Sequence, residues 1–242
     1  MRHAGFEPDS ELGFPGTRIY PDRARGPETA EMRLRREQLN RSREYFEEAL
    51  DLNLQDEKAQ TNIVFWMGWI DYINGDFENA LNEWESIDPR YSNSDPVLLI
   101  ARGNAYFYTN QQRAALGYYL KVKEEFETEA RRITIPDPTD EQQRYTMLTL
   151  SAVYNNIGAV YEREHAEMRS RRGPIQDLQE LEKNALLHYY NAVDIARKMD
   201  QDNEIARTNI QLAFKYGASD EAHEPIIDDW VPPVLYSLRE DI

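Results

Sequence analysis

The stretch "MGWIDYINGDFENALNEW", residues 67–84, reappears in a related form as "RGNAYFYTNQQRAALGYY", residues 102–119. Small, turn-forming and aromatic residues keep their places at a single offset of 35 residues. The matching positions are Gly68 with Gly103, Ala80 with Ala115, Leu81 with Leu116, and Trp84 with Tyr119. Self-similarity at a fixed period of about 20 to 50 residues is typical of proteins built from stacked repeats.

The residues around these stretches predict helical hairpins joined by short turns. Apolar residues recur at helical spacing, and Asn74-Gly75 ends one helix because glycine accepts the left-handed conformation of a C-terminal cap. Asp95 is placed to cap a further helix that has Pro96 in its first turn. The expected helices span 29–54, 58–73, 77–86, 96–109, 112–130, 139–171, 175–199 and 202–216.

Two connections interrupt this pattern. Residues 87–96, "IDPRYSNSDP", are expected to form a loop. A second break precedes residue 139, where Thr139 and Gln142 have the spacing of a capping box, so we expect Thr139 to begin the long helix that follows.

The hairpins resemble tetratricopeptide repeats, which are units of about 34 residues with two antiparallel helices. The family pattern has a small residue at the eighth position, glycine at the turn, and alanine and aromatic residues on the second helix. The unit that starts near Thr61 matches at Gly68, Gly75, Phe77, Ala80 and Trp84, and the next unit at Gly103, Tyr106, Ala115 and Tyr119. A third unit matches at Gly158, Tyr161, Ala185, Tyr189 and Ala192, with about 15 extra residues between its helices.

The resemblance implies an all-α fold, a right-handed α-solenoid of about three to four such units plus a capping helix. We expect a repeat domain over 28–217, between an extended or disordered arm at 1–27 and an acidic tail with tryptophan and proline at 218–242. The expected units lie near 23–56, 61–94, 96–135 and 151–200, with the capping helix at 202–216.

Composition limits the classes of function. The 242 residues carry a formal charge of −16, which opposes binding to nucleic acid and to anionic lipid. The absence of cysteine excludes disulfides and thiolate chemistry on this chain. No apolar run is long enough for a membrane span or a signal-peptide core, so we expect a soluble protein, cytoplasmic or periplasmic, with no membrane insertion.

No pattern in the sequence indicates catalysis. Phosphate-binding loops, nucleophile elbows and zinc-protease motifs are absent, and the histidines His3, His165, His188 and His223 are scattered. We therefore expect a protein that is not an enzyme, with no catalytic, cofactor-binding or metal-binding residues.

The candidate binding surface follows from the resemblance. In tetratricopeptide repeats the first helix of each unit lines a concave groove, and asparagine there offers both a donor and an acceptor to a peptide backbone. The corresponding residues here are Asn62, Phe65, Trp69, Tyr72, Val97, Ile100, Asn104, Phe107, Tyr108 and Asn155. The lysine that chaperone-binding members use to grip a terminal carboxylate is missing, since its place is taken by Phe65 and Ile100.

Two alternatives compete with an open groove. The aromatic residues could simply be core, because an elongated helix pair buries more than one stripe. The tail could also cover them, since Trp230 and its aliphatic neighbours are suited either to packing on the repeats or to binding a partner as a linear motif.

The sequence thus predicts a scaffold for protein–protein interaction that binds a basic or apolar segment of another protein in the groove. The alternative is a structural subunit of a larger assembly, of the cell-envelope or motility type, whose groove is permanently occupied. Nucleic acid is not an expected partner, and oligomerisation is compatible with either function.

Overall fold

The chain is described by a computed structural model that covers residues 30–52, 56–92, 95–201, 206–207 and 210. These residues form helices and no strand, so the expected all-α class is confirmed for them. The helices are α1 (Ala30–Asp51), α2 (Glu57–Ile73), α3 (Phe77–Ser86), α4 (Pro89–Ser92), α5 (Pro96–Tyr108), α6 (Gln112–Ala130), α7 (Glu141–Ser170) and α8 (Ile175–Arg197). Their bounds agree closely with those expected from the sequence.

The structure corrects two details of the expected connections. Residues 87–96 are not only a loop, because the short helix α4 lies within them. The N-cap of α7 is Asp140 rather than Thr139: the Asp140 carboxylate accepts from the Gln143 N–H at 3.0 Å and from the Gln143 side chain at 3.0 Å. Thr139 is instead held by Asp137, to which its N–H and its hydroxyl both donate.

Several predicted segments lie outside the described residues. These are the arm at 1–27, the tail at 218–242 with Trp230, and most of the capping helix at 202–216. Of that last segment only 206, 207 and 210 are described, and they are helical.

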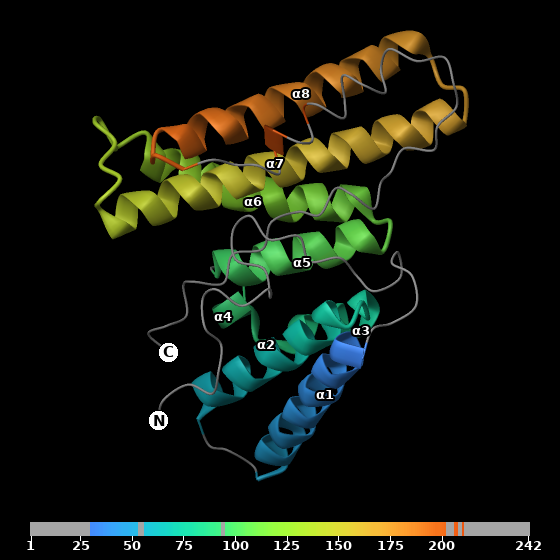
Figure 1. Ribbon diagram of the computed structural model, residues 1–242, viewed down its shortest axis with the longest axis vertical. Helices are drawn as coiled ribbons and strands as arrows, with labels where there is room; N and C mark the ends of the chain where they lie inside the picture. Colours follow the sequence, from blue (N-terminus) through green and yellow to red (C-terminus); the bar gives the residue numbers. More distant parts are fainter. Residues whose placement is uncertain (1–29, 53–55, 93–94, 202–205, 208–209, 211–242) are drawn as a thin grey trace.

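The hairpins follow one another in chain order along the long axis of the molecule (Figure 1). Within each pair α2 packs on α3, α5 on α6, and α7 on α8, while α3 contacts α5 and α6 contacts α7 across the junctions. The side chains form two core clusters, one around α2 and α3 and one that runs from α5 to α8. The α7–α8 hairpin is the longest and reaches past the end of α5 and α6.

The tight turns inside the first two hairpins have the same backbone geometry. Gly75 has a φ of 78°, and Asn110, at the same place 35 residues later, has a φ of 61°. Glycine and asparagine are the residues that enter this left-handed region most readily, so the sequence permits a turn of the same kind twice.

Each hairpin is closed by an aromatic ring that lies against a glycine of its first helix. A Cβ atom added to Gly68 would lie 2.5 Å from Trp84, one added to Gly103 would lie 2.5 Å from Tyr119, and one added to Gly158 would lie 2.6 Å from Tyr189. Since no real Cβ comes so near another atom, only glycine allows the two helices to approach to this distance. The 35-residue offset noted in the sequence therefore reflects one contact made twice, and the third hairpin repeats it.

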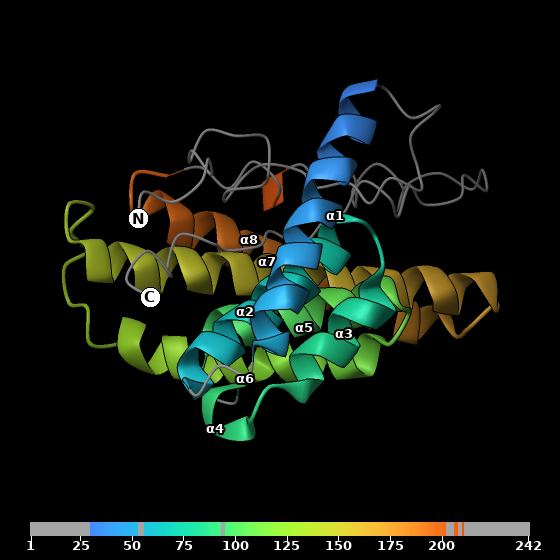
Figure 2. The same ribbon diagram turned by 90° about the horizontal axis from the view of Figure 1, so that it is seen from below.

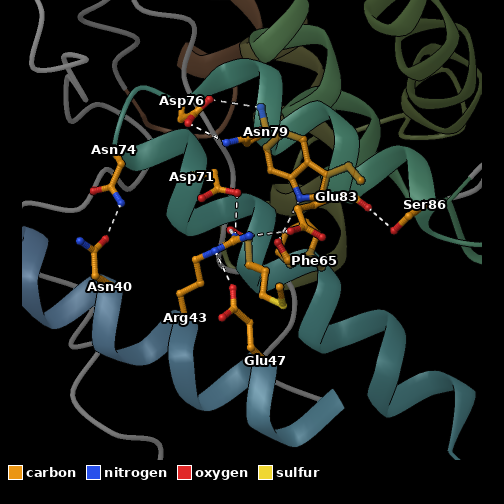
Figure 3. A network of polar contacts seen from close by, with 12 residues as sticks. Asn40, Arg43, Glu47, Phe65, Asp71, Asn74, Asp76, Asn79, Glu83 and Ser86 are labelled. Atoms are coloured by element: carbon orange, nitrogen blue, oxygen red, sulfur yellow. Dashed lines mark hydrogen bonds and ion pairs between the residues drawn. The ribbon is translucent and has the colours of Figure 1, made fainter. Parts of the chain in front are cut away.

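Helix α1 is attached to this core by a polar network as well as by packing (Figure 3). The Arg43 guanidinium donates to Asp71 at 2.8 Å on α2 and to Glu83 at 2.8 Å on α3, and its Nε lies 3.1 Å from Glu47 on its own helix. Burial raises the pKa of Asp71 to about 6, an effect that outweighs the lowering by Arg43. Arg43 therefore neutralises two carboxylates that would otherwise repel each other.

Gly103→Ala should destabilise the protein, because the new methyl group would overlap the ring of Tyr119. We expect the free energy of unfolding to fall by about 1–3 kcal/mol. Gly117→Ala is the matched control on the neighbouring helix, since a Cβ there meets no atom within 4 Å. It should stabilise by about 0.5–1 kcal/mol through helix propensity alone. Urea unfolding of both variants checks the contrast, and equal effects would contradict the packing argument.

Arg43→Met should lower the free energy of unfolding by about 1–2 kcal/mol, because it leaves Asp71 and Glu83 without their shared cation in a partly buried place. Arg132→Met, in the exposed connection between α6 and α7, is the control and should change stability little. The comparison is made by urea unfolding at neutral pH. An Arg43 variant as stable as the control would show that the network does not hold α1.

Candidate functional site

The predicted binding residues lie on α2, α5 and α7, as expected, and most of them are buried. Asn62 and Tyr108 are half-buried, whereas Trp230 lies outside the described residues. The buried members are Phe65, Trp69, Tyr72, Val97, Ile100, Asn104, Phe107 and Asn155. Their burial gives them a part in the packing of the hairpins. Their role in binding a partner stays a prediction.

Aromatic rings form a continuous row from α2 to α5. The ring centroids of Trp69 and Tyr72 are 5.1 Å apart, Tyr72 meets Tyr108 edge-on at 6.1 Å, and Tyr108 stacks on Phe77 at 4.5 Å. Offset-stacked and edge-to-face pairs at these distances are favourable. The row therefore links the first two hairpins along the face that the sequence assigns to the groove.

A buried polar cluster lies beside this row, centred on the side chain of Asn104. The Asn104 Oδ1 accepts from the Tyr119 hydroxyl at 2.6 Å and from the Asn156 amide at 3.1 Å. Asn156 comes from α7, so the cluster joins the second hairpin to the third. The sequence indicated Asn104 but not Asn156, whose only signal was its place next to Asn155.

Three polar atoms of this cluster have no hydrogen-bond partner: the Asn104 amide nitrogen and the hydroxyls of Tyr72 and Tyr108. Burial raises the pKa of Tyr72, against a lowering by the neighbouring Asn104 and Tyr108 side chains. Buried polar groups are normally satisfied, by water where protein atoms do not serve. A buried water molecule is the ordinary partner for unmet groups of this kind.

Arg163 of α7 lies at the edge of this cluster. Its guanidinium carbon is 5.4 Å from the centroid of the Phe107 ring, and its Nη2 donates to Asn110 in the turn between α5 and α6. Its charge also lowers the pKa of Tyr108, against the larger rise caused by burial. This edge of the cluster thus combines aromatic rings, amide groups and one cation.

Glu162 is a buried acid one residue before Arg163. Its side chain is 8% exposed, and its Oε2 accepts from the Tyr189 hydroxyl at 2.9 Å. Burial, with a smaller contribution from Glu182, raises the pKa of Glu162 to about 8, although the Tyr189 hydrogen bond lowers it. The carboxyl group is therefore mostly protonated at neutral pH.

Within the part of the chain that the structure describes, no group of three or more histidine, aspartate or glutamate side chains is arranged to hold a metal ion. None of the described helices is both long and apolar enough to cross a membrane.

A scan against protein-family models gives no match to the chain, and a search of curated proteins gives no relative.

Glu162→Gln should stabilise the protein at high pH, because the amide keeps an acceptor for Tyr189 but never ionises. Folded Glu162 keeps its proton up to about pH 8, whereas the unfolded chain releases it near pH 4.5. Wild-type stability should therefore fall as the pH rises through this window. At pH 8 we expect the variant to be more stable by about 4 kcal/mol, and the difference should vanish below about pH 4.

The measurement is urea unfolding at a series of pH values. The matched control is Glu180→Gln, which removes an exposed carboxyl from α8 and should follow the wild-type pH dependence. A Glu162 variant whose advantage is the same at every pH would mean that the carboxyl group does not titrate on unfolding.

Proposed function

We propose that the chain is a protein-interaction scaffold of the tetratricopeptide type and not an enzyme. The observation that carries this proposal is the contact between glycine and aromatic ring that recurs in three successive hairpins. Hairpins whose two helices pack in the same way are the units that we propose stack into a right-handed α-solenoid, an architecture whose extended surfaces serve protein binding.

The binding face that we propose comprises α2, α5 and α7. It contains the aromatic row, the unmet polar atoms of Asn104, Tyr72 and Tyr108, and the guanidinium of Arg163. An extended segment of a partner protein would place apolar side chains against the rings and backbone amides at the cluster. The chain's charge of −16 favours a partner with basic or apolar character and opposes nucleic acid.

A structural subunit of a larger assembly is the second candidate. The α7–α8 hairpin favours it, because 31 residues separate Gly158 from Tyr189 whereas 16 separate the corresponding residues of the other two hairpins. A generic peptide scaffold has no need of a hairpin that reaches past its neighbours, while a subunit in an assembly of the cell-envelope or motility type can use it to contact an adjacent protein.

The first step in testing the binding face is to purify the full chain from its native cells together with the partner protein bound to it. Tyr108→Ala removes a half-buried ring of the proposed binding face, and Tyr190→Ala removes an exposed ring from α8 as the matched control. Circular dichroism first confirms that both variants fold. The partner segment found by cross-linking is then made as a peptide and titrated.

We expect a micromolar dissociation constant that rises about tenfold or more in Tyr108→Ala, as for a binding hot spot, and stays unchanged in Tyr190→Ala. Binding that survives the first change and is lost on the second would place the partner on α8 and contradict the proposal. A partner held in a complex that the peptide cannot displace would favour the structural subunit.

A further inference from the structure

Helix α1 presents a row of exposed residues on the side that faces away from the other helices. Figure 2, seen from below, shows α1 lying across the end of the molecule. Leu34 is 56% exposed, Tyr45 is 68% exposed and Leu52, in the turn that follows the helix, is 79% exposed. Leu39 and Arg43, in contrast, are directed at α2 and α3. The outer face of α1 is therefore apolar at its two ends and near its centre, and none of the described helices covers it.

The spacing of this face is that of a helix–helix seam. The exposed positions follow one another at intervals of four, three, four, three and four residues, which is the a and d pattern of a heptad repeat. All six side chains of the row are exposed: Leu34, Gln38, Arg41, Tyr45, Glu48 and Leu52. We call this row the outer seam of α1. A heptad seam on a helix at the end of a stack is shaped to receive one further helix.

The outer seam is complementary to itself when two copies run antiparallel. If the two-fold axis passes near residue 43, Leu34 meets the partner's Leu52, Gln38 meets the partner's Glu48, and Arg41 meets the partner's Tyr45. Each contact then occurs twice. Two pairs are apolar, two join an amide to a carboxylate, and two place a guanidinium on a tyrosine ring, which is a favourable cation–π geometry.

Charge excludes the parallel arrangement and supports the antiparallel one. A parallel pair would set Arg41 against the partner's Arg41 and Glu48 against the partner's Glu48, so like charges would repel at the seam. Before residue 43, α1 carries four arginines and two glutamates, whereas after it the helix carries four carboxylates and no basic residue: Glu44, Glu47, Glu48 and Asp51. Antiparallel pairing brings each basic half against an acidic half.

We propose that α1 is a dimerisation helix, and that its occupant is the outer seam of a second copy of this chain in antiparallel orientation. This surface is separate from the binding face formed by α2, α5 and α7, so the proposal does not depend on that function. The seam from Leu34 to Leu52 is about 27 Å long. One helix pair of this length buries an area at the low end of specific interfaces, so the dissociation constant should be micromolar.

The first test uses cysteine cross-linking, which is unambiguous because the chain contains no cysteine. Leu34→Cys and Leu52→Cys proteins are prepared separately, mixed and oxidised. We expect a disulfide between one copy of each variant, because these positions meet in the antiparallel dimer. Leu34→Cys alone should not cross-link with itself, because the two copies of position 34 would lie about 27 Å apart. Cross-linking of Leu34→Cys with itself would overturn the orientation.

The second test places a charge at Gln38. Each substitution should change the affinity of the dimer in one direction and the stability of the monomer's helix in the other. Gln38→Lys would face the partner's Glu48 twice, and Gln38→Glu would set like charges together. Sedimentation equilibrium should show the dissociation constant falling about threefold for lysine and rising about threefold for glutamate. Within its own helix the same position lies three residues before Arg41, so lysine should lower and glutamate should raise the melting temperature of the monomer.

A chain that remains monomeric up to hundreds of micromolar, about a hundredfold above the expected dissociation constant, would overturn the proposal. A monomeric chain in which the thiols of the Leu34→Cys and Leu52→Cys variants resist alkylation would also overturn the proposal. A segment of the same chain would then cover the outer seam. A dimer whose dissociation constant is unchanged by both Gln38 substitutions would mean that another surface forms it.

Discussion

The contact between a glycine and an aromatic ring fixes the distance between the two helices of every hairpin, and the remaining packing depends on that distance. In each case the polar hydrogen of the ring is also used. Trp84 donates to the Phe65 carbonyl at 3.0 Å, Tyr119 to Asn104 at 2.6 Å and Tyr189 to Glu162 at 2.9 Å. The ring therefore packs on the first helix and bonds to it, which fixes both the separation and the register of the pair. A side chain larger than hydrogen at the glycine would disturb both.

This constraint explains why the predicted groove residues are largely buried. Because each hairpin is closely packed, its first helix must also contact the preceding hairpin to cover the remaining apolar surface. Residues 151–160 of α7 are buried without exception, and Ser151 donates to the Ala192 carbonyl at 2.7 Å while Asn156 bonds to Asn104 on α5. Inner-face residues are thus shared between packing and the polar cluster, whose half-buried edge lies at Tyr108 and Arg163.

The sequence predicted the parts of this structure that local chemistry determines. Helix bounds and the turn at Gly75 follow from spacing and from residue size alone, whereas the packing of Trp84 on Gly68 is seen only in the structure. Contacts that join distant elements could not be predicted in this way. Nothing local in the sequence indicates the role of Arg43, because its partners Asp71 and Glu83 lie on other helices.

Arg102 is a second residue whose partner lies on another helix: it is buried, and its guanidinium donates to the Trp84 carbonyl at the end of α3. The burial of the groove residues was weighed as an alternative, and the sequence could not decide it because burial depends on how successive hairpins pack.

The groups that accept hydrogen bonds from Trp84, Tyr119 and Tyr189 differ in chemistry, although the contact between ring and glycine is the same in all three hairpins. A main-chain carbonyl serves Trp84 and an amide oxygen serves Tyr119, and both are neutral groups suited to a dry interior. The third acceptor is the carboxyl group of Glu162, which would be costly to bury as an anion. Its raised pKa resolves the difference, because a protonated carboxyl is also a neutral acceptor. Tyr189 lies where the α7–α8 hairpin continues past its neighbours, so the one titratable member of the series stands where the longest hairpin leaves the stack. A change of protonation there would weaken the contact that holds α7 and α8 together, while the neutral acceptors of the other two hairpins would be unaffected.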